Sequence, residues 1–412
     1  MKKFNKAIKI TSSALLALCM VFLMSACSNS NSQSEQSQIT EQTTEQTTVQ
    51  PTTMSEEEIN DQKLDKFISN MTLEEKVWQM FYVRCPDEDA VKQVSEYNIG
   101  GYILFGRDFD GKTKDEVIND IQSYQDEADI PLLIGVDEEG GTVVRVSSNP
   151  NLRETPFLSP KDTYSNGGWD AIEQDANDKA DLLLSLGINV NMAPVCDMTS
   201  DEYGFMYDRS FSSDVDMEDR YVRTVVETSK AKKLGTVLKH FPGYGNNSDT
   251  HTGIAYDDRE YSEFENTDFK PFYQGIESGT DCILVSHNIV NCMDSEYPAS
   301  LSQKVHNILR NDFKFDGVIM TDDLIMDAIT EFTGDEAAAV TAAKCGNDLL
   351  CCSSVETQYP AVLEAVQNGE IPESQVDASV KRILKWKQNL GIFNIDTYQK
   401  KVRTTEPNDA TE

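Results

Sequence analysis

Two of the four histidines lie close together in the stretch "KHFPGYGNNSDTH", residues 239–251. Lys239 and His240 end an apolar run, and the glycine-rich loop that follows leads to Asp249 and His251. Residues two apart in an extended segment point to the same side, so the Asp249 carboxylate could accept the ring N–H of His251 and fix its tautomer. A histidine oriented in this way is suited to general acid/base catalysis. The stretch therefore predicts a cationic strand end, a flexible loop and then an acid/base pair.

Two other interpretations of these histidines are open. Two histidines with carboxylates could bind zinc, but the cationic Lys239 next to His240 disfavours a metal ion, and no H-x-x-x-H spacing is present. A histidine in a polar loop is also common on an ordinary protein surface. We predict no metal and no cofactor, because the neighbouring aspartate and glycines favour acid/base chemistry.

Two further motifs place acids after apolar runs. In "GVDEEGGTVVRV", Asp137 precedes a Gly-Gly pair and Arg145, and a carboxylate with a guanidinium could hold sugar hydroxyls by charge-assisted hydrogen bonds. In "FDGVIMTDDLIM", Asp322 is the first acid after the apolar run. Each motif alone also fits a structural role, either as a tight turn or as an acid that caps the next helix.

The elements that must position these residues follow a regular rhythm. Helical segments alternate with apolar runs typical of strands buried on both faces. The eight runs cover residues 79–83, 102–105, 131–136, 188–195, 236–241, 282–287, 317–321 and 347–352. This order predicts an α/β fold, a TIM-like (β/α)8 barrel that forms a single catalytic domain, with a doubly wound open sheet as the alternative. The barrel is favoured because polar residues follow the strands at Asp137, Asp197, His240, His287 and Asp322, and only a barrel brings all these ends to one mouth.

The N-terminal part differs from the rest in composition. Residues 1–26 combine four lysines with the apolar run "ALLALCMVFLM" and end in "LMSAC", which predicts a lipoprotein signal peptide with lipidation of Cys27. A plain signal peptide cleaved near Ala26 is the alternative. Residues 27–58 are rich in Ser, Thr, Gln and Glu, so we expect a disordered tether. The barrel is then expected over 59–395 and a polar tail over 396–412. These features predict an extracytoplasmic protein of a bacterium, lipid-anchored to the cell membrane.

Charge and cysteine content exclude some classes of protein. The formal net charge is −34, and about −38 once the four lysines of the signal are removed, so nucleic acid is not an expected partner. Seven cysteines follow the signal region, without C-x-x-C spacing. Several lie in apolar runs, which favours buried free thiols over a disulfide framework.

The ordered set of motifs resembles glycoside hydrolase family 3, in its β-N-acetylglucosaminidase branch. The resemblance runs through most of residues 70–390 and includes "MTLEEKVWQM", "GVDEEGGTVVRV", "KHFPGYG", "SDTH" and "GVIMTDDLIM". It implies a TIM-like barrel and a retaining glycosidase that needs no metal. By this resemblance Asp322 is the nucleophile and His251, supported by Asp249, the acid/base residue. The residues expected to bind the terminal sugar are Asp137, Arg145, Arg209, Lys239 and His240, to which we add His287.

The chain departs from the family pattern at three positions. Glu138 stands where Gln is common, Thr142 where a larger polar residue is common, and Tyr244 where the loop often has a second histidine. We expect these residues at the rim of the pocket. We also expect cations at Lys239, Arg145 and Arg209 to keep Asp322 ionised.

The predicted function is that of a retaining exo-β-N-acetylhexosaminidase acting on cell-wall muropeptide fragments or chitin oligosaccharides. We expect a monomer that binds an amino-sugar oligosaccharide or peptidoglycan fragment. Alternatives are a phosphorolytic N-acetylglucosaminidase, in which phosphate replaces water, and a β-glucosidase of the same family. A sugar-binding lipoprotein is the alternative from outside the enzymes, but simple sugar binding would not require the Asp-x-His loop.

Overall fold

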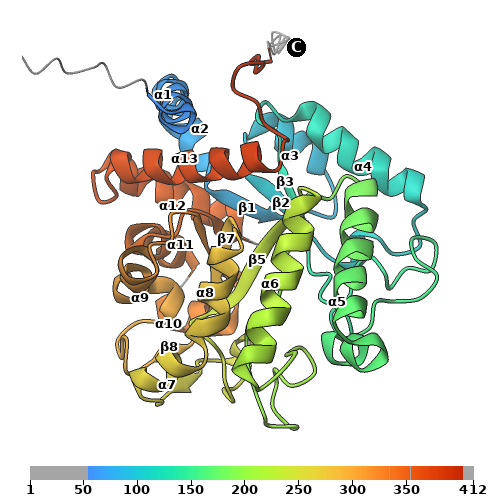
Figure 1. Cartoon of the computed structure of the whole chain (residues 1–412). Coiled ribbons are helices and arrows are strands. Elements are labelled where there is room, and N and C mark those ends of the chain that lie inside the picture. The colour runs from blue at the N-terminus through green and yellow to red at the C-terminus, as the bar shows by residue number, and fades with distance from the viewer. Residues whose placement is uncertain (1–53, 334, 353, 402–412) are drawn as a thin grey trace, which may run out of the picture. The chain divides into compact units, whose positions relative to one another are not determined.

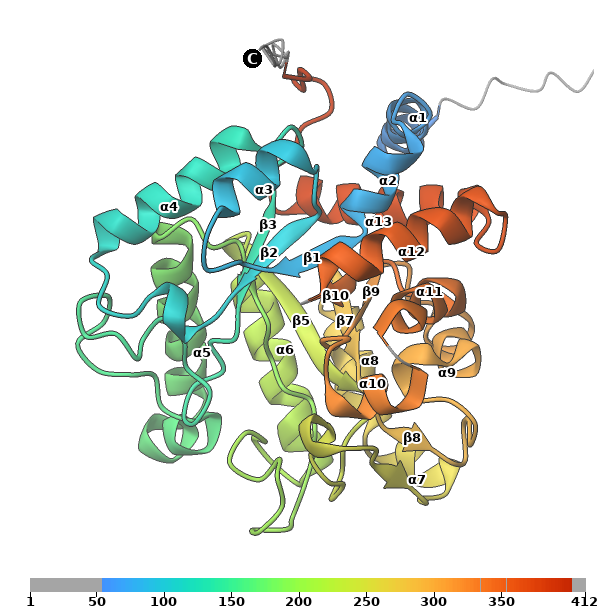
Figure 2. The same cartoon turned by 180° about the vertical axis from the view of Figure 1, so that it is seen from behind.

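The computed structural model describes residues 54–401 except 334 and 353. Parallel strands run through the centre of this part of the chain, and helices surround them (Figures 1 and 2). The central strands are β1 (Phe81–Arg84), β2 (Gly101–Leu104), β3 (Leu133–Val136), β4 (Val190–Asn191), β5 (Gly235–Phe241), β7 (Cys282–Val285), β9 (Val318–Thr321) and β10 (Leu350–Cys352). Each of them overlaps one of the eight predicted apolar runs.

The strands form a barrel and not an open sheet. Their order is β10-β1-β2-β3-β4-β5-β7-β9, and each neighbouring pair is parallel. A parallel bridge between Met320 and Leu349 joins the region of β9 to that of β10 and so brings the two ends of the order together. The predicted (β/α)8 barrel is confirmed, and the doubly wound alternative is wrong. A small parallel pair, β6 (Tyr256–Asp257) with β8 (Ile289–Val290), lies outside the barrel.

The helices lie around the strands as a barrel requires. They are α1 (Glu56–Ile68), α2 (Leu73–Gln79), α3 (Ala90–Glu96), α4 (Lys114–Glu127), α5 (Pro160–Ser185), α6 (Val215–Ala231), α7 (Tyr261–Asn266), α8 (Phe269–Glu277), α9 (Gln303–Asn307), α10 (Asp327–Thr333), α11 (Asp335–Cys345), α12 (Val355–Gln367) and α13 (Glu373–Asn389). Thr72 and Glu75 form a capping box at the start of α2. Helices α12 and α13 pack against α1 and α2, so both ends of the domain meet at one side of the barrel.

The folded part begins earlier than the predicted boundary at residue 59. Ser55 and Glu58 form a second capping box, and α1 starts at Glu56. Three acids in the first turn suit the positive end of the helix dipole, which is why this acidic segment is helical although it resembles the tether in composition. The predicted signal peptide, Cys27 and residues 27–53 of the tether lie outside the described residues.

The core consists of the strands and the apolar faces of the helices. All four residues of β2, β3, β7 and β9 are buried. All seven cysteines after the signal region are free thiols, and all except Cys292 are buried, as the sequence predicts.

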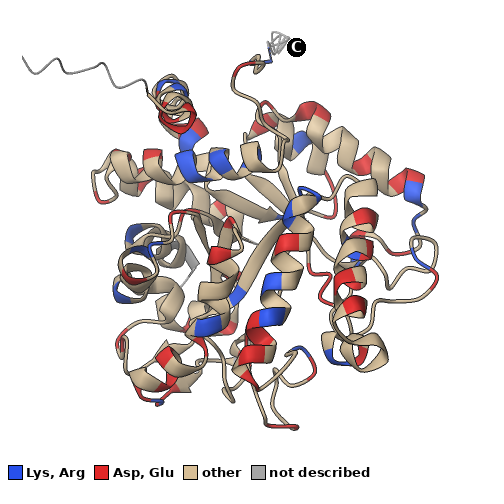
Figure 3. Cartoon of the chain, in the orientation of Figure 1, with Lys and Arg blue, Asp and Glu red and all other residues tan. Residues whose placement is uncertain are grey.

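The start of the polar tail packs onto the barrel, where Tyr398 lies edge-on to Phe67 at 4.9 Å. Within the described part of the chain, no helix is long and apolar enough to cross a membrane. Acidic residues are spread over many helices and loops (Figure 3).

Candidate active site

The carboxyl ends of the barrel strands open into a cavity of about 660 Å³. Arg84 ends β1, Asp137 follows β3, Lys239 and His240 lie near the end of β5, and Asp322 follows β9. Their side chains line this cavity together with residues from the connecting loops. Its volume is within the range of about 300–1,000 Å³ that is typical of small-ligand sites. The expected convergence of polar strand ends at one mouth is therefore confirmed for these residues.

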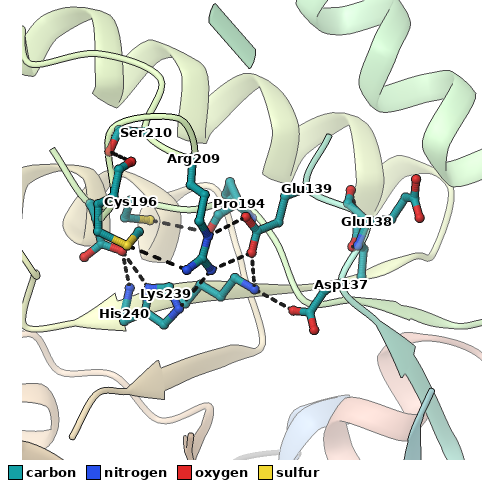
Figure 4. A network of polar contacts seen from close by, with 12 residues as sticks. Asp137, Glu138, Glu139, Pro194, Cys196, Arg209, Ser210, Lys239 and His240 are labelled. Carbon is teal, nitrogen blue, oxygen red and sulfur yellow. Dashed lines mark hydrogen bonds and ion pairs between the residues drawn. The ribbon is translucent and has the colours of Figure 1, made fainter. Parts of the chain in front are cut away.

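A buried network of alternating charges forms one wall of the cavity (Figure 4). The Lys239 Nζ atom lies 2.7 Å from Asp137 Oδ1 and 2.6 Å from Glu139 Oε1. Glu139 also accepts two hydrogen bonds from the Arg209 guanidinium, at 2.9 and 2.8 Å. Burial raises the pKa of the Glu139 carboxyl, but Arg209 and Lys239 outweigh burial and hold this pKa well below its usual range. Glu139 is therefore an anion shared by two cations.

Lys239 remains charged although it is buried. Burial lowers the pKa of its ammonium group, but Asp137 and Glu139 more than compensate, and the pKa is raised. The two acids and two bases of the wall thus fix one another in place. Such an arrangement presents charged hydrogen-bond donors and acceptors in fixed positions, which suits the recognition of sugar hydroxyl groups.

His240 is oriented by Asp197. The His240 Nδ1 atom lies 2.6 Å from Asp197 Oδ2, and the His240 backbone N–H donates to the same oxygen at 3.1 Å. The second ring nitrogen, Nε2, lies 3.4 Å from Arg209 Nη2 at the cavity wall. Asp197 accepts the hydrogen bond of the Nδ1–H group and so fixes the orientation of the imidazole ring. Asp197, which is fully buried, is the positioning partner of this histidine.

Asp322 lies partly exposed at the mouth of the barrel, and its Oδ1 atom accepts the N–H of Asp323 at 2.9 Å. Burial raises the pKa of Asp322, but His287, His240 and this backbone N–H outweigh burial, so that the pKa is lowered. The carboxylate is therefore ionised, as expected. The expected cause is wrong, because histidines supply the effect in place of Lys239, Arg145 and Arg209. Two of those three cations, Lys239 and Arg209, are already paired with Glu139.

The predicted pairing of Asp249 with His251 is present. The His251 Nδ1 atom lies 2.7 Å from Asp249 Oδ1, and the backbone N–H of His251 donates to the same oxygen at 3.0 Å. The His251 side chain is 60% exposed, so its Nε2 can meet a ligand or water. Both residues line the same cavity as Asp322. The arrangement therefore combines an ionised carboxylate, an oriented imidazole and a polar binding wall.

Comparison with known proteins identifies the family of this chain. The model of the glycosyl hydrolase family 3 N terminal domain matches residues 72–386. The chain belongs to glycosyl hydrolase family 3. A β-hexosaminidase of Hydrogenovibrio crunogenus is 33% identical over 277 residues, which cover 65% of this chain and 75% of that protein. The β-hexosaminidase LpqI of Mycobacterium tuberculosis is 31% identical over 331 residues, covering 76% of this chain and 82% of that protein.

A solved structure of a family 3 β-N-acetylglucosaminidase from Paenibacillus has the same fold. The TM-score is 0.73 at 28% sequence identity, and the match covers 81% of this chain. This family 3 chain spans 65% of the length of that Paenibacillus protein.

One predicted sugar-binding residue of this family 3 chain is not in the cavity. His287 is fully buried, and its Nδ1 atom lies 2.7 Å from Ser300 Oγ while its Nε2 atom lies 3.0 Å from the Asp323 carbonyl oxygen. Burial lowers the pKa of this imidazole, although the charge of Asp322 opposes the effect, and Nε2 donates to the Asp323 carbonyl oxygen, which can only accept. His287 follows β7 by two residues, but its side chain points into the wall. It orients the backbone beside Asp322 and does not contact the ligand space.

Glu138 is likewise not at the rim. It is fully buried, and its carboxylate accepts the backbone N–H groups of Arg145 and Val146 at 2.9 and 2.7 Å. It therefore holds the backbone of Arg145, whose side chain lines the cavity. Thr142 and Tyr244 do line the cavity, as expected.

Sequence reasoning missed several residues of the site. Glu139 belongs to the motif "GVDEEGGTVVRV", but its residue type does not distinguish it from the neighbouring Glu138. Arg84 ends β1 and lines the cavity, and its Nε has no hydrogen-bond partner within the described residues. Its position directly after the apolar run 79–83 was the available signal. No group of three or more His, Cys, Asp or Glu side chains in the described part of the chain is arranged to hold a metal ion.

Proposed function

We propose that this family 3 chain is a retaining exo-β-N-acetylhexosaminidase that hydrolyses terminal N-acetyl-β-glucosaminides. The observation that carries the proposal is that Asp322 and the Asp249–His251 pair line one cavity. The names of the β-hexosaminidase relatives support the same activity. Cell-wall muropeptide fragments and chitin oligosaccharides are the substrates with the required terminal sugar.

The mechanism follows from the positions of the side chains. Asp137, Arg145 and the Lys239–Glu139–Arg209 wall hold the terminal sugar by its hydroxyl groups. The Asp322 carboxylate attacks the anomeric carbon while protonated His251 donates its proton to the departing oxygen, and a glycosyl-Asp322 intermediate forms. Neutral His251 then takes a proton from water, which attacks the same carbon and releases the sugar and the Asp322 carboxylate. Asp249 holds the imidazole in the tautomer that presents Nε2 for both steps.

The test is hydrolysis of an aryl N-acetyl-β-glucosaminide. Asp322→Ala is expected to lower kcat by about 1,000-fold or more because it removes the nucleophile. His251→Ala is expected to lower kcat by about 100-fold or more. Asp170→Asn changes an exposed acid on α5 and is the matched control, expected to match the wild type. Wild-type turnover by the Asp322 or His251 variant would contradict the assignment. NMR of the first-formed product should show the β anomer, and an α anomer would exclude the retaining mechanism.

The alternatives are separated by the substrate panel and the buffer. Aryl β-glucosides are expected to react slowly compared with N-acetyl-β-glucosaminides, and the reverse order would indicate a β-glucosidase. The same reactions in phosphate and in phosphate-free buffer should give free sugar in both cases. Formation of a sugar 1-phosphate would instead identify a phosphorylase. Tight binding of the sugar without turnover would indicate a sugar-binding lipoprotein.

We also propose that the protein is anchored to the outer face of a bacterial cell membrane through a lipid on Cys27. The support comes from the "LMSAC" ending of the signal region and the polar composition of residues 28–53. The full chain expressed in a bacterium is expected to fractionate with the membrane. Cys27→Ser should release it to the soluble fraction, whereas Cys19→Ser within the signal region should not. An unchanged distribution of the Cys27 variant would contradict the anchor.

A further inference from the structure

Tyr244 connects the two ends of the acid/base loop, defined here as residues 243–253. The Tyr244 hydroxyl is hydrogen bonded to the Thr250 hydroxyl, and both side chains are buried. Thr250 lies between Asp249 and His251 in the chain. Tyr244 therefore holds the residue between Asp249 and His251, the two residues of the loop to which we assign a catalytic role.

Tyr244 is itself fixed to the sugar-binding wall. Its backbone N–H donates to Asp197 Oδ1 at 2.7 Å, and Asp197 is also the partner of His240. The Tyr244 ring lies edge-on to the His240 ring at 5.2 Å between centroids. The Tyr244 hydroxyl consequently projects from a rigid base. Burial raises the pKa of this hydroxyl, which keeps it protonated and able to donate or accept.

The start of the acid/base loop is anchored independently. Arg259 donates to the Gly243 carbonyl oxygen at 3.1 Å and is itself held by Asp257 and Asp268. At the far end of the loop, the turn Thr250–Thr252 contacts α10, which follows the nucleophile in the chain. Between these two points Asn246 and Ser248 are exposed. Asn246 also accepts a hydrogen bond from Thr199 Oγ1 at 2.7 Å, and the hydroxyl pair of Tyr244 and Thr250 is the buried contact directly beside Asp249 and His251.

We propose that Tyr244 is a positioning residue, which holds the acid/base loop closed and keeps Asp249 and His251 aimed into the cavity through its hydroxyl bond to Thr250. This inference rests on the proposed function for its kinetic consequence, but its structural part is independent of it. Without the hydroxyl bond the loop spends less time closed. Proton donation by His251 then becomes less efficient, while attack by Asp322 is unchanged because Asp322 follows a different strand.

The kinetic signature is a dependence on the leaving group. A glycoside with a strongly acidic leaving group, such as dinitrophenol, departs without a proton, whereas an alkyl or sugar leaving group needs proton transfer from His251. Tyr244→Phe keeps the ring and removes only the hydroxyl. It is expected to lower kcat/KM by about tenfold, or about 1.4 kcal/mol, for a methyl N-acetyl-β-glucosaminide. For the dinitrophenyl substrate the expected change is less than about threefold.

Two further variants sharpen the experiment. Thr250→Val removes the other hydroxyl and should give the same pair of effects, and the double variant should be no worse than either single variant because one bond is lost in each case. Tyr102→Phe is the matched control, since the Tyr102 hydroxyl is also buried and bonded, to the Ala90 carbonyl at 2.9 Å, but lies away from the site. It should leave both substrates unchanged. Equal losses on both substrates in Tyr244→Phe, or no loss on either, would overturn the proposal.

Amide hydrogen exchange of the ligand-free protein gives a readout that needs no activity. Segment 245–251 is expected to exchange at least about threefold faster in Tyr244→Phe and Thr250→Val than in the wild type, and at the wild-type rate in Tyr102→Phe. Unchanged exchange would refute the closing role whatever the kinetics. If the wild type cleaves no N-acetyl-β-glucosaminide while exchange behaves as expected, the proposed function has failed and the closing role of Tyr244 stands.

Discussion

Replacing Glu139 by Gln should destabilise the protein far more than a single isosteric change normally does. The Glu139 carboxylate receives Lys239 at 2.6 Å and Arg209 at 2.8 and 2.9 Å, all in a buried wall. Gln retains one acceptor oxygen, but its amide N–H groups face a cation, so either Arg209 loses its carboxylate partner or Lys239 keeps only Asp137. Removing one member of a buried ion pair typically costs about 3–5 kcal/mol. Since domains are stable by about 5–15 kcal/mol, we expect a loss of about a third of the free energy of unfolding.

The measurement is urea unfolding at pH 7, in which a loss of about 4 kcal/mol shifts the midpoint by more than about 1 M. The loss of stability depends on pH, because the pKa of Glu139 is lowered in the folded state. Its contribution is present above the unfolded pKa of about 4.3 and is lost as the pH falls, so wild type and variant should converge in acid. Glu227→Gln, at an exposed site on α6, is the control and should stay within about 0.5 kcal/mol of wild type. A Glu139→Gln protein within about 1 kcal/mol of wild type at pH 7 would refute the reasoning.

Two further predictions concern other buried groups. Burial lowers the pKa of Lys387 to about 7, with Gln79 Oε1 as its partner at 2.8 Å. The unfolded chain therefore binds a proton between pH 7 and about 10.4 that the folded chain has lost, and stability should rise by roughly 4 kcal/mol over that window. Lys387→Met should abolish the rise in urea unfolding at pH 7 to 10, and an unchanged slope would contradict it. His287→Ala should lower kcat about tenfold with KM within about twofold, because His287 orients the backbone beside Asp322 without lining the cavity. A raised KM at constant kcat would instead indicate a sugar contact.

The barrel could be predicted because its strands are buried on both faces. Such strands read as continuous apolar runs, so all eight were found, and the first polar residue after a run marked the mouth. Asp137 and Asp322 were found in this way, each directly after its strand. The Asp249–His251 pairing was predictable because two residues in a short segment determine the contact locally. Local patterns therefore identified Asp137, Asp322 and the Asp249–His251 pair of the cavity.

The partner of each charge could not be predicted, because partners come from different strands. Glu138 and Glu139 are adjacent acids of the same length, yet one holds backbone N–H groups and the other holds two cations. The choice depends on where Lys239 and Arg209 lie, about 100 and 70 residues further along the chain. The predicted sugar contact of His287 was wrong for a related reason. Its place after β7 is that of a mouth residue, but the direction of its side chain is set by Ser300 and the Asp323 carbonyl.

The pairing of Lys239 and Arg209 with Glu139 has a chemical consequence for Asp322. Had Lys239 or Arg209 paired directly with the Asp322 carboxylate, the negative charge would be strongly stabilised and the oxygen would be a weaker nucleophile. Glu139 occupies both cations instead, so they serve as rigid donors in the binding wall. Asp322 is kept ionised by the histidines and by one backbone N–H, interactions that oppose burial without forming a salt bridge to lysine or arginine. An acid that never touches the reacting atoms thus allows the same cavity to contain strong cations and a carboxylate that is free to attack.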